Sequence, residues 1–252
     1  MTFDVAGDAY DRFMGRYSRP LAARFADWLE VAPGQEAIDV GCGPGALTGV
    51  LVERLGGGGV RAVDPSAPFV ETCRERFPGV DVRQGAAESL PFEDATCDVA
   101  AACLVVHFMT DPVAGVGEMR RVTRPGGRVG ATVWDLAGSR APMWPLWDAV
   151  AELEPQHPGE RGFRGGSRTG LVEILEAAGL RDVESAEVEV TVSHPSFEEW
   201  WEPYLHGVGP AGDAVAALGP DGRRRLEEVL RRRLGDGPFD LSAVAYVARG
   251  RP

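Results

Sequence analysis

The chain has 252 residues, of which 44% are hydrophobic, an ordinary composition for a single globular domain of this length. Its formal net charge of −12 opposes nonspecific binding to nucleic acid and to anionic membranes. All 26 basic residues are arginine, so the chain has no P-loop lysine, no Schiff-base lysine and no Tyr-x-x-x-Lys pair.

Neither an export signal nor a membrane segment is apparent in the sequence. The first 20 residues are charged and lack the apolar stretch of a secretory signal, and no run of 18 apolar residues occurs. The four cysteines form no Cys-x-x-Cys pair, and His157, His194 and His206 have no partners at metal-ligand spacing. We therefore expect a cytoplasmic protein with reduced thiols, no metal site, and neither membrane nor nucleic acid as a partner.

The predicted elements begin with a helix over residues 10–29, in which aromatic and leucine side chains recur every four residues. From residue 36 to residue 135, short apolar runs alternate with helical runs, the pattern of βαβ units that build a parallel sheet. The expected strands are residues 37–40, 60–63, 80–84, 99–104 and 128–134. The expected helices are residues 46–55, 68–77 and 113–122.

The sequence predicts one further loop within the core and four elements after it. The four glycines at 56–59 are expected to form a loop. After the core, the sequence predicts a helix over 170–180, a strand near 183–192, a helical segment over 196–234 and a last strand over 243–249. The chain is therefore predicted to be an α/β protein with seven strands.

The segment AIDVGCGPGALT, residues 37–48, runs from a predicted strand directly into a helix. Gly41, Gly43 and Gly45 stand at alternate positions and leave the backbone bare, so that a ligand can lie against the peptide. Asp64 ends the next strand, where a carboxylate can accept both hydroxyls of a ribose. These features indicate an adenosyl or a dinucleotide site, because Gly41-x-Gly43-x-x-Ala46 also fits the dinucleotide pattern.

Further positions make the pattern more specific. The string DVGCGPG, with Asp39 two residues before Gly41, resembles motif I of class I S-adenosylmethionine (SAM)-dependent methyltransferases. The segments 85–92 (GAAESLPF), 97–109 and 124–127 (RPGG) resemble later elements of that family, in its order and with its spacing. The resemblance is to the small-molecule branch that includes the ubiquinone and menaquinone methyltransferases.

This resemblance implies a Rossmann-like, mostly parallel seven-stranded sheet with helices on both faces. It implies N-terminal lid helices over 1–36, a SAM-binding core over 37–135, and cap insertions with the closing helix and last strands over 136–252. The cofactor is SAM, the product S-adenosylhomocysteine, and the partner a small-molecule methyl acceptor. The residues implied to bind the cofactor are Tyr10, Arg16, Asp39, Gly41, Gly43, Gly45, Asp64, Pro65, Ala87, Glu88, Ala102, Cys103 and Leu104.

The implied roles differ along the cofactor. The glycines would line its methionyl and ribose parts, Asp64 would hold the ribose, and Asp39 would act near the methionyl amine. Arg16 could bind the methionyl carboxylate as a bidentate ion pair. Ala87 and Glu88 would border the adenine, although many relatives carry Asp where this chain has Ala86, so the adenine amino group needs another acceptor.

The acceptor pocket is expected among aromatic residues near the lid and outside the parallel core. His107 follows the fourth strand and could deprotonate an acceptor hydroxyl, because the unperturbed pKa of histidine is near neutrality, or it could serve a structural role. The aromatic residues could equally be the core of a cap. The candidate pocket residues are Tyr17, Trp134, Trp144, Trp200, Trp201 and Tyr204.

Three functions remain open at this point. The first is methyl transfer by in-line displacement to a small, mostly apolar acceptor, the second an NAD(P)-dependent oxidoreductase, and the third a non-catalytic SAM-binding protein. Pro44 together with Asp39, and the missing Tyr-x-x-x-Lys pair, favour SAM over a nicotinamide. The intact glycines and Asp64 argue against a degenerate site.

Overall fold

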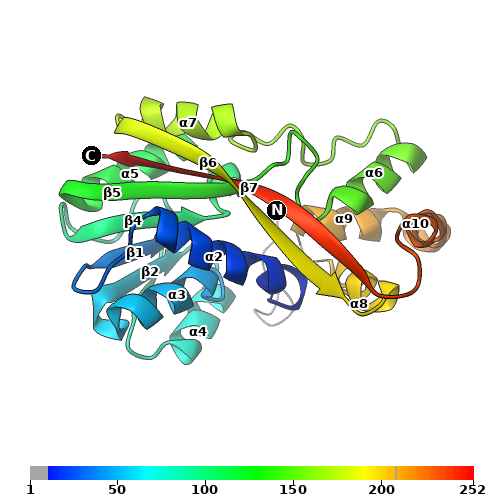
Figure 1. The fold of residues 1–252 in the computed structure, drawn as a ribbon, viewed down its shortest axis with the longest axis horizontal. Helices are drawn as coiled ribbons and strands as arrows, with labels where there is room; N and C mark the ends of the chain where they lie inside the picture. Colours follow the sequence, from blue (N-terminus) through cyan, green and yellow to red (C-terminus); the bar gives the residue numbers. More distant parts are fainter. Residues whose placement is uncertain (1–10, 208) are drawn as a thin grey trace.

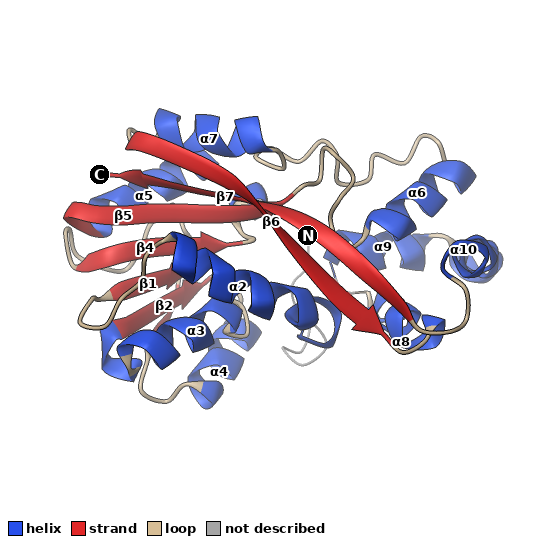
Figure 2. Ribbon diagram, in the orientation of Figure 1, coloured by secondary structure: helices blue, strands red, loops and turns tan. Residues whose placement is uncertain are grey.

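The computed structural model describes residues 11–207 and 209–252 of the chain. A seven-stranded sheet with the order β3-β2-β1-β4-β5-β7-β6 runs through the molecule (Figures 1 and 2). β7 is antiparallel to both of its neighbours, and the pairs from β3 across to β5 are parallel. The strands are β1 (Ala37–Val40), β2 (Val60–Asp64), β3 (Asp81–Gln84), β4 (Cys97–Cys103), β5 (Thr123–Trp134), β6 (Arg181–His194) and β7 (Phe239–Arg251). The seven predicted strands and the mostly parallel sheet are confirmed.

Helices cover both faces of the sheet, as the short, apolar central strands require. On one face, α2 (Arg16–Trp28), α3 (Ala46–Leu55) and α4 (Ala67–Arg76) share a core with the sheet. On the other face, α5 (Pro112–Val122) and α7 (Arg168–Ala177) bury their apolar sides in a second core. The predicted helix over 10–29 is α2, preceded by a π-helical turn at Asp11–Gly15.

A third apolar cluster lies at one end of the molecule and forms a cap. β6 and β7 extend beyond the parallel strands and reach this cap, as Figure 1 shows. The cap includes residues of α6, α8, α9 and α10, and its buried core contains Leu146, Phe197 and Leu230. Its elements are α6 (Trp144–Leu153), α8 (Phe197–Trp201), the 3-10 turn η4 (Glu202–His206), α9 (Gly209–Ala217) and α10 (Gly219–Leu234).

The structure corrects three details of the predicted elements. The helical segment predicted over 196–234 is broken into α8, η4, α9 and α10, with Gly207 and Gly219 in the left-handed region at breaks between them. Helix α6 was not predicted. The glycines expected to form a loop include a 3-10 turn at Gly57–Gly59, η2, closed by a hydrogen bond from the N–H of Gly59 to the carbonyl of Gly56.

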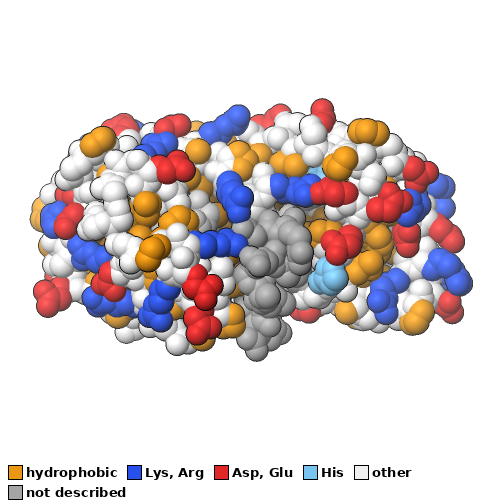
Figure 3. Space-filling view, turned by 90° about the horizontal axis from the view of Figure 1, so that it is seen from below, with side chains coloured by type: hydrophobic (Ala, Val, Ile, Leu, Met, Phe, Trp, Pro, Cys, Tyr) orange, Lys and Arg blue, Asp and Glu red, His pale blue; other side chains and the backbone are white. Residues whose placement is uncertain are grey.

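Charged side chains of both signs are interspersed on the surface seen in Figure 3 rather than gathered by sign. Many of them pair across elements, as Arg231 does with Glu198 and Asp236. Within the described residues, no helix combines the length and the apolar character needed to span a bilayer.

Candidate active site

A cavity of about 760 Å³, part of it open to solvent, lies at the carboxyl ends of β1, β2 and β4. We call it the first cavity. The order of the sheet reverses between β1 and β4, and ligands of open α/β sheets bind at such a switch point. The predicted residues that line it are Asp39, Gly41, Gly43, Asp64, Pro65, Cys103 and Leu104. Lining residues that the sequence reasoning missed include Ser18, Cys42, Ser66, Phe69, Val105 and Phe108.

Two glycines of the loop after β1 serve different purposes. Gly43 has a φ of +52°, and nothing lies within 4 Å of the position that a Cβ would take. Gly41 has a φ of +74°, and a Cβ there would lie 2.5 Å from a methyl group of Val105. Gly41 is therefore required for packing, whereas Gly43 exposes bare backbone beside the first cavity.

Asp64 is held in place by the backbone of two loops. Its Oδ2 accepts a hydrogen bond of 2.8 Å from the N–H of Gly43, and its Oδ1 accepts one of 2.8 Å from the N–H of Ser66. Burial raises the pKa of this carboxyl, while the two backbone hydrogen bonds oppose the rise. Each carboxylate oxygen retains a lone pair, so Asp64 can still accept hydroxyl donors from a ligand in the cavity.

Two buried oxygens among the residues that line the first cavity have no hydrogen-bond partner in the described part of the chain. Asp39 is fully buried, and Thr48 donates a hydrogen bond of 2.6 Å to its Oδ2, but its Oδ1 has no partner. Burial raises the pKa of Asp39 to about 7. The hydroxyl of Ser18, which comes from α2, is the other orphan. Buried polar atoms are rarely left unpaired in proteins, so this pair indicates a ligand with complementary groups.

The remaining residues predicted to bind a cofactor do not line the first cavity. Gly45 precedes α3 and packs against Phe77, where a Cβ would lie 2.4 Å from the ring. Ala87 and Ala102 are buried in the core below α5. Glu88 accepts a hydrogen bond of 3.1 Å from the N–H of Asp111. Tyr10 lies outside the described residues.

The two predicted lid residues in α2 belong to a polar cluster under the cap. Nη1 of Arg16 donates a hydrogen bond of 2.8 Å to Oε2 of Glu199 and lies 3.0 Å from Nδ1 of His194. The hydroxyl of Tyr17 lies 2.7 Å from Nε2 of the same histidine. Arg16, expected to bind the methionyl carboxylate, is thus paired with Glu199 and is not among the residues that line the first cavity.

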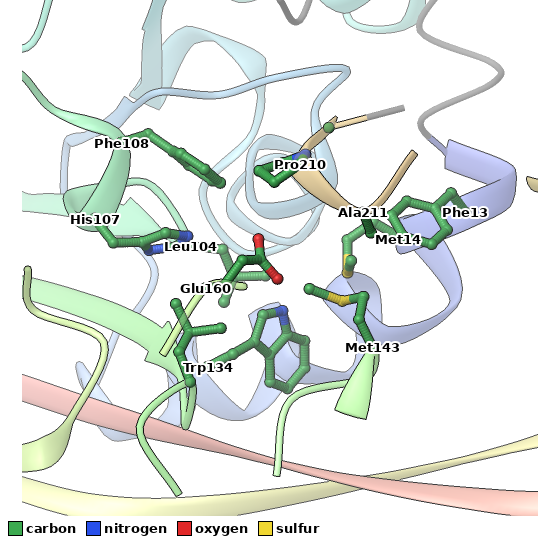
Figure 4. Close-up of a pocket in the computed structure, with 12 residues that line it drawn as sticks. Phe13, Met14, Leu104, His107, Phe108, Trp134, Met143, Glu160, Pro210 and Ala211 are labelled. Atoms are coloured by element: carbon green, nitrogen blue, oxygen red, sulfur yellow. The ribbon is translucent and has the colours of Figure 1, made fainter. Parts of the chain in front are cut away.

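A second cavity, of about 470 Å³ with part of it open to solvent, adjoins the first and shares Leu104 and Phe108 with it. Its walls are mostly apolar, and Figure 4 shows Phe13, Met14 and Met143 grouped on one side. His107 and Glu160 are its titratable lining residues.

The aromatic residues expected to form an acceptor pocket are spread over several places. Trp134 lines the second cavity. Trp200 and Tyr204 border a smaller cavity of about 260 Å³ together with Arg16 and Tyr17. Trp144 and Trp201 pack into the cap core and line neither the first nor the second cavity.

His107 has an apolar environment that keeps it neutral. Its ring lies 4.0 Å from the ring of Phe108 and 6.2 Å from that of Phe163, measured between centroids. Burial lowers its pKa to about 3. Its Nδ1 is buried and has no partner in the described structure. A neutral imidazole here can form a hydrogen bond with a ligand but is a weak base.

Glu160 was not predicted from the sequence, where it is one acidic residue in a loop rich in glycine and proline. The loop between α6 and α7 carries it into the second cavity, and its carboxyl lies near the middle of Figure 4. The indole N–H of Trp147 donates a hydrogen bond of 2.6 Å to its Oε2. Burial raises its pKa to about 7. No local pattern marks such a residue, because its environment is created by the cap.

Comparison with known proteins agrees with this geometry. Residues 38–130 match the family described as a methyltransferase domain. Nocamycin O-methyltransferase of Saccharothrix syringae is 29% identical over 281 aligned residues, which cover 100% of this chain and 98% of that protein. An uncharacterized methyltransferase of Mycobacterium tuberculosis is 38% identical over 56% of this chain and 54% of that protein, about half its length.

The fold is shared with solved structures. A SAM-dependent methyltransferase from Aquifex aeolicus superposes with a TM-score of 0.54 at 22% sequence identity, over 73% of this chain and 93% of that one. The matching domain, the relatives and the strand order agree with one another. The chain thus carries a methyltransferase domain over residues 38–130, and its fold is that of the class I SAM-dependent methyltransferases.

Proposed function

We propose that this chain transfers a methyl group from SAM to a small, largely apolar acceptor by in-line displacement. The observation that carries the proposal is the pair of adjoining cavities that share Leu104 and Phe108. The first cavity has bare glycine backbone and two buried carboxyls, whereas the second has mostly apolar walls. A donor and an acceptor bound in them would meet at the shared residues, which favours transfer by positioning.

The residues of the first cavity fit SAM, which when bound supplies a methyl group activated by a positively charged sulfur. Asp64 would accept the ribose hydroxyls, and Gly43 would let the ligand lie against the backbone. The unpaired Oδ1 of Asp39 would accept from the methionyl ammonium, and the unpaired hydroxyl of Ser18 would donate to the methionyl carboxylate. Ser18, rather than Arg16 as the sequence suggested, would thus bind the methionyl carboxylate.

Several observations support a small-molecule acceptor. The second cavity is lined mainly by apolar and aromatic side chains with a few polar groups, as small-molecule pockets are. A relative that aligns over the whole chain is named nocamycin O-methyltransferase. A net charge of −12 opposes a nucleic-acid acceptor. The four cysteines are free, which suits the cytoplasmic location that we propose.

Thermal unfolding with SAM, S-adenosylhomocysteine, NAD and NADP tests the cofactor. We expect the first two to stabilise the protein by about 2.7 kcal/mol when present at roughly 100 times their Kd, and the nicotinamides to have no effect. Stabilisation by NAD or NADP alone would support an oxidoreductase instead.

Turnover tests the enzyme. Protein incubated with methyl-labelled SAM and a small-molecule extract should transfer label into an apolar fraction. Gly43→Ala, which places a methyl group beside the first cavity, serves as the control and should transfer much less label when SAM is present near the wild-type Kd. Cofactor binding without any transfer, over extracts from several growth conditions, would support a SAM-binding protein without catalysis.

A further inference from the structure

The second cavity contains three polar groups with unused hydrogen-bonding capacity in the described structure. Among the described residues, Trp147 donates to Oε2 of Glu160, and no donor to its Oε1 is found. Nδ1 of His107 and the indole N–H of Trp134 are buried and unpaired. Figure 4 shows the carboxyl of Glu160 between the side chains of His107 and Trp134. The mostly apolar cavity is therefore lined by one acceptor (the carboxylate of Glu160), one donor (the indole N–H of Trp134) and one group that can donate or accept (the imidazole of His107).

Glu160 is held in position by the fold of its loop. The Trp147 ring stacks on His157 at 5.5 Å between centroids, and its N–H donates to Glu160. The carbonyl of Glu160 accepts from the N–H of Phe163 at 3.1 Å. Glu160 is only 3% exposed, and no arginine is among the described residues that line the cavity beside it. Burial of a carboxyl without a cation costs stability, so a positioned one in a cavity indicates a functional role.

The pattern of unused groups identifies the chemistry of the acceptor. A hydroxyl group donates one hydrogen bond and accepts others, so it can satisfy Glu160 and Trp134 together. An ammonium group has donors alone and would leave the indole N–H of Trp134 unpaired. An ether or a hydrocarbon would leave the carboxylate unpaired.

We infer that Glu160 binds the hydroxyl of a phenolic or enolic acceptor and removes its proton. This inference rests on the proposed methyl transfer and makes oxygen the methylated atom. In the proton transfer, the O–H bond of the acceptor breaks and an O–H bond forms on Oε1 of Glu160. The electron pair stays on the acceptor oxygen, which becomes the nucleophile, and the negative charge moves from the carboxylate to that oxygen.

The other titratable groups near Glu160 are weaker bases or stay neutral, so the carboxylate of Glu160 is the group that accepts the proton. His107, from the 3-10 turn η3 (Val106–Phe108), has a pKa near 3 and is the weaker base. Tyr204, from η4, is buried, and both this burial and the charge of Glu160 raise its pKa, so it stays neutral. The pKa of Glu160, near 7, makes its carboxylate a stronger base than an ordinary glutamate.

The test measures binding of three probes of one shape to protein saturated with S-adenosylhomocysteine and to free protein. The probes are 2-naphthol, 2-methoxynaphthalene and 2-naphthylmethylammonium, and calorimetry follows them from about pH 5.5 to about pH 8.5, where an aromatic hydroxyl keeps its proton. Wild-type protein should prefer the naphthol to its methyl ether, and the preference should grow as the pH rises through about 7. Glu160→Gln keeps an oxygen for Trp147 and should fold. It should weaken naphthol binding about tenfold at the highest pH, leave the ether unchanged and remove the pH dependence.

Glu154→Gln is the matched control, because it makes the same chemical change at an exposed position of the same loop and should behave as wild type. Equal binding of naphthol and ether, absence of naphthol binding, or an unchanged preference in Glu160→Gln would each overturn the inference. Tighter binding of the ammonium probe through Glu160 would replace the hydroxyl class by an amine. Binding of S-adenosylhomocysteine is measured separately in the same samples, so its loss would count against the proposed function and not against Glu160.

Discussion

Replacing Gly43 by alanine isolates the contribution of bare backbone to cofactor binding. The residue has a φ of +52°, a conformation in which a Cβ costs about 1–2 kcal/mol. No atom lies within 4 Å of the Cβ position, so no steric clash within the protein adds to this cost. For a chain of this size, we expect the midpoint of thermal unfolding to fall by about 2–8 °C.

The effect on binding should be larger than the effect on stability. A ligand packed against Gly43 would meet the added methyl group, and overpacking of this kind costs about 1–3 kcal/mol. Calorimetric titration with S-adenosylhomocysteine should therefore show a Kd raised by about 10- to 100-fold.

Gly34→Ala provides the control for backbone strain. Gly34 also has a positive φ, of +88°, with nothing within 4 Å of a Cβ, but it lies in an exposed turn before β1. Its alanine variant should lose similar stability and bind S-adenosylhomocysteine as wild type does. If Gly43→Ala kept wild-type affinity while losing the same stability as Gly34→Ala, the cofactor would not lie against Gly43, and the reasoning would be refuted.

Three further predictions concern the polar groups of the first cavity. Asp64→Ala should weaken binding of S-adenosylhomocysteine by about 1.5–3 kcal/mol. It should also lower the free energy of unfolding by about 1–2 kcal/mol, because two backbone N–H groups lose their acceptor. Unchanged affinity in calorimetry would mean that the ribose is held elsewhere. Burial holds the pKa of Asp39 near 7, and a bound ammonium favours the ionised carboxylate, so binding releases a proton at low pH. Affinity should therefore fall by up to about tenfold per pH unit below about pH 7, and a slope that persists in Asp39→Asn would assign it to another group. Ser18→Ala should raise the Kd for S-adenosylhomocysteine by about 5- to 30-fold. Arg16→Met should leave this Kd unchanged and lower the free energy of unfolding, because Glu199 loses its cation. The reverse result would mean that Arg16 binds the methionyl carboxylate.

The sequence alone determined the features that depend on local chemistry. Short apolar runs between helical periods predicted the central strands of the sheet, since a strand covered on both faces must be apolar throughout. The glycine loop and Asp64 were recognisable because a tight turn under a ligand requires glycine at fixed spacing. Those features lie within about 30 residues of one another, and they are the ones that bring Asp39, Gly43 and Asp64 to the first cavity.

The tertiary structure decided which side chains meet across long distances in the chain. Arg16 pairs with Glu199, 183 residues away, and nothing near Arg16 in the sequence indicates that partner. From the sequence, the aromatic residues of α8 and η4 could be either pocket or core. Trp201 lies in the core of the cap, which β6 and β7 reach by extending beyond the parallel strands. Ser18 and Glu160 gained their importance from burial, which raises the cost of an unpaired polar group and is a property of the packed fold rather than of any local segment.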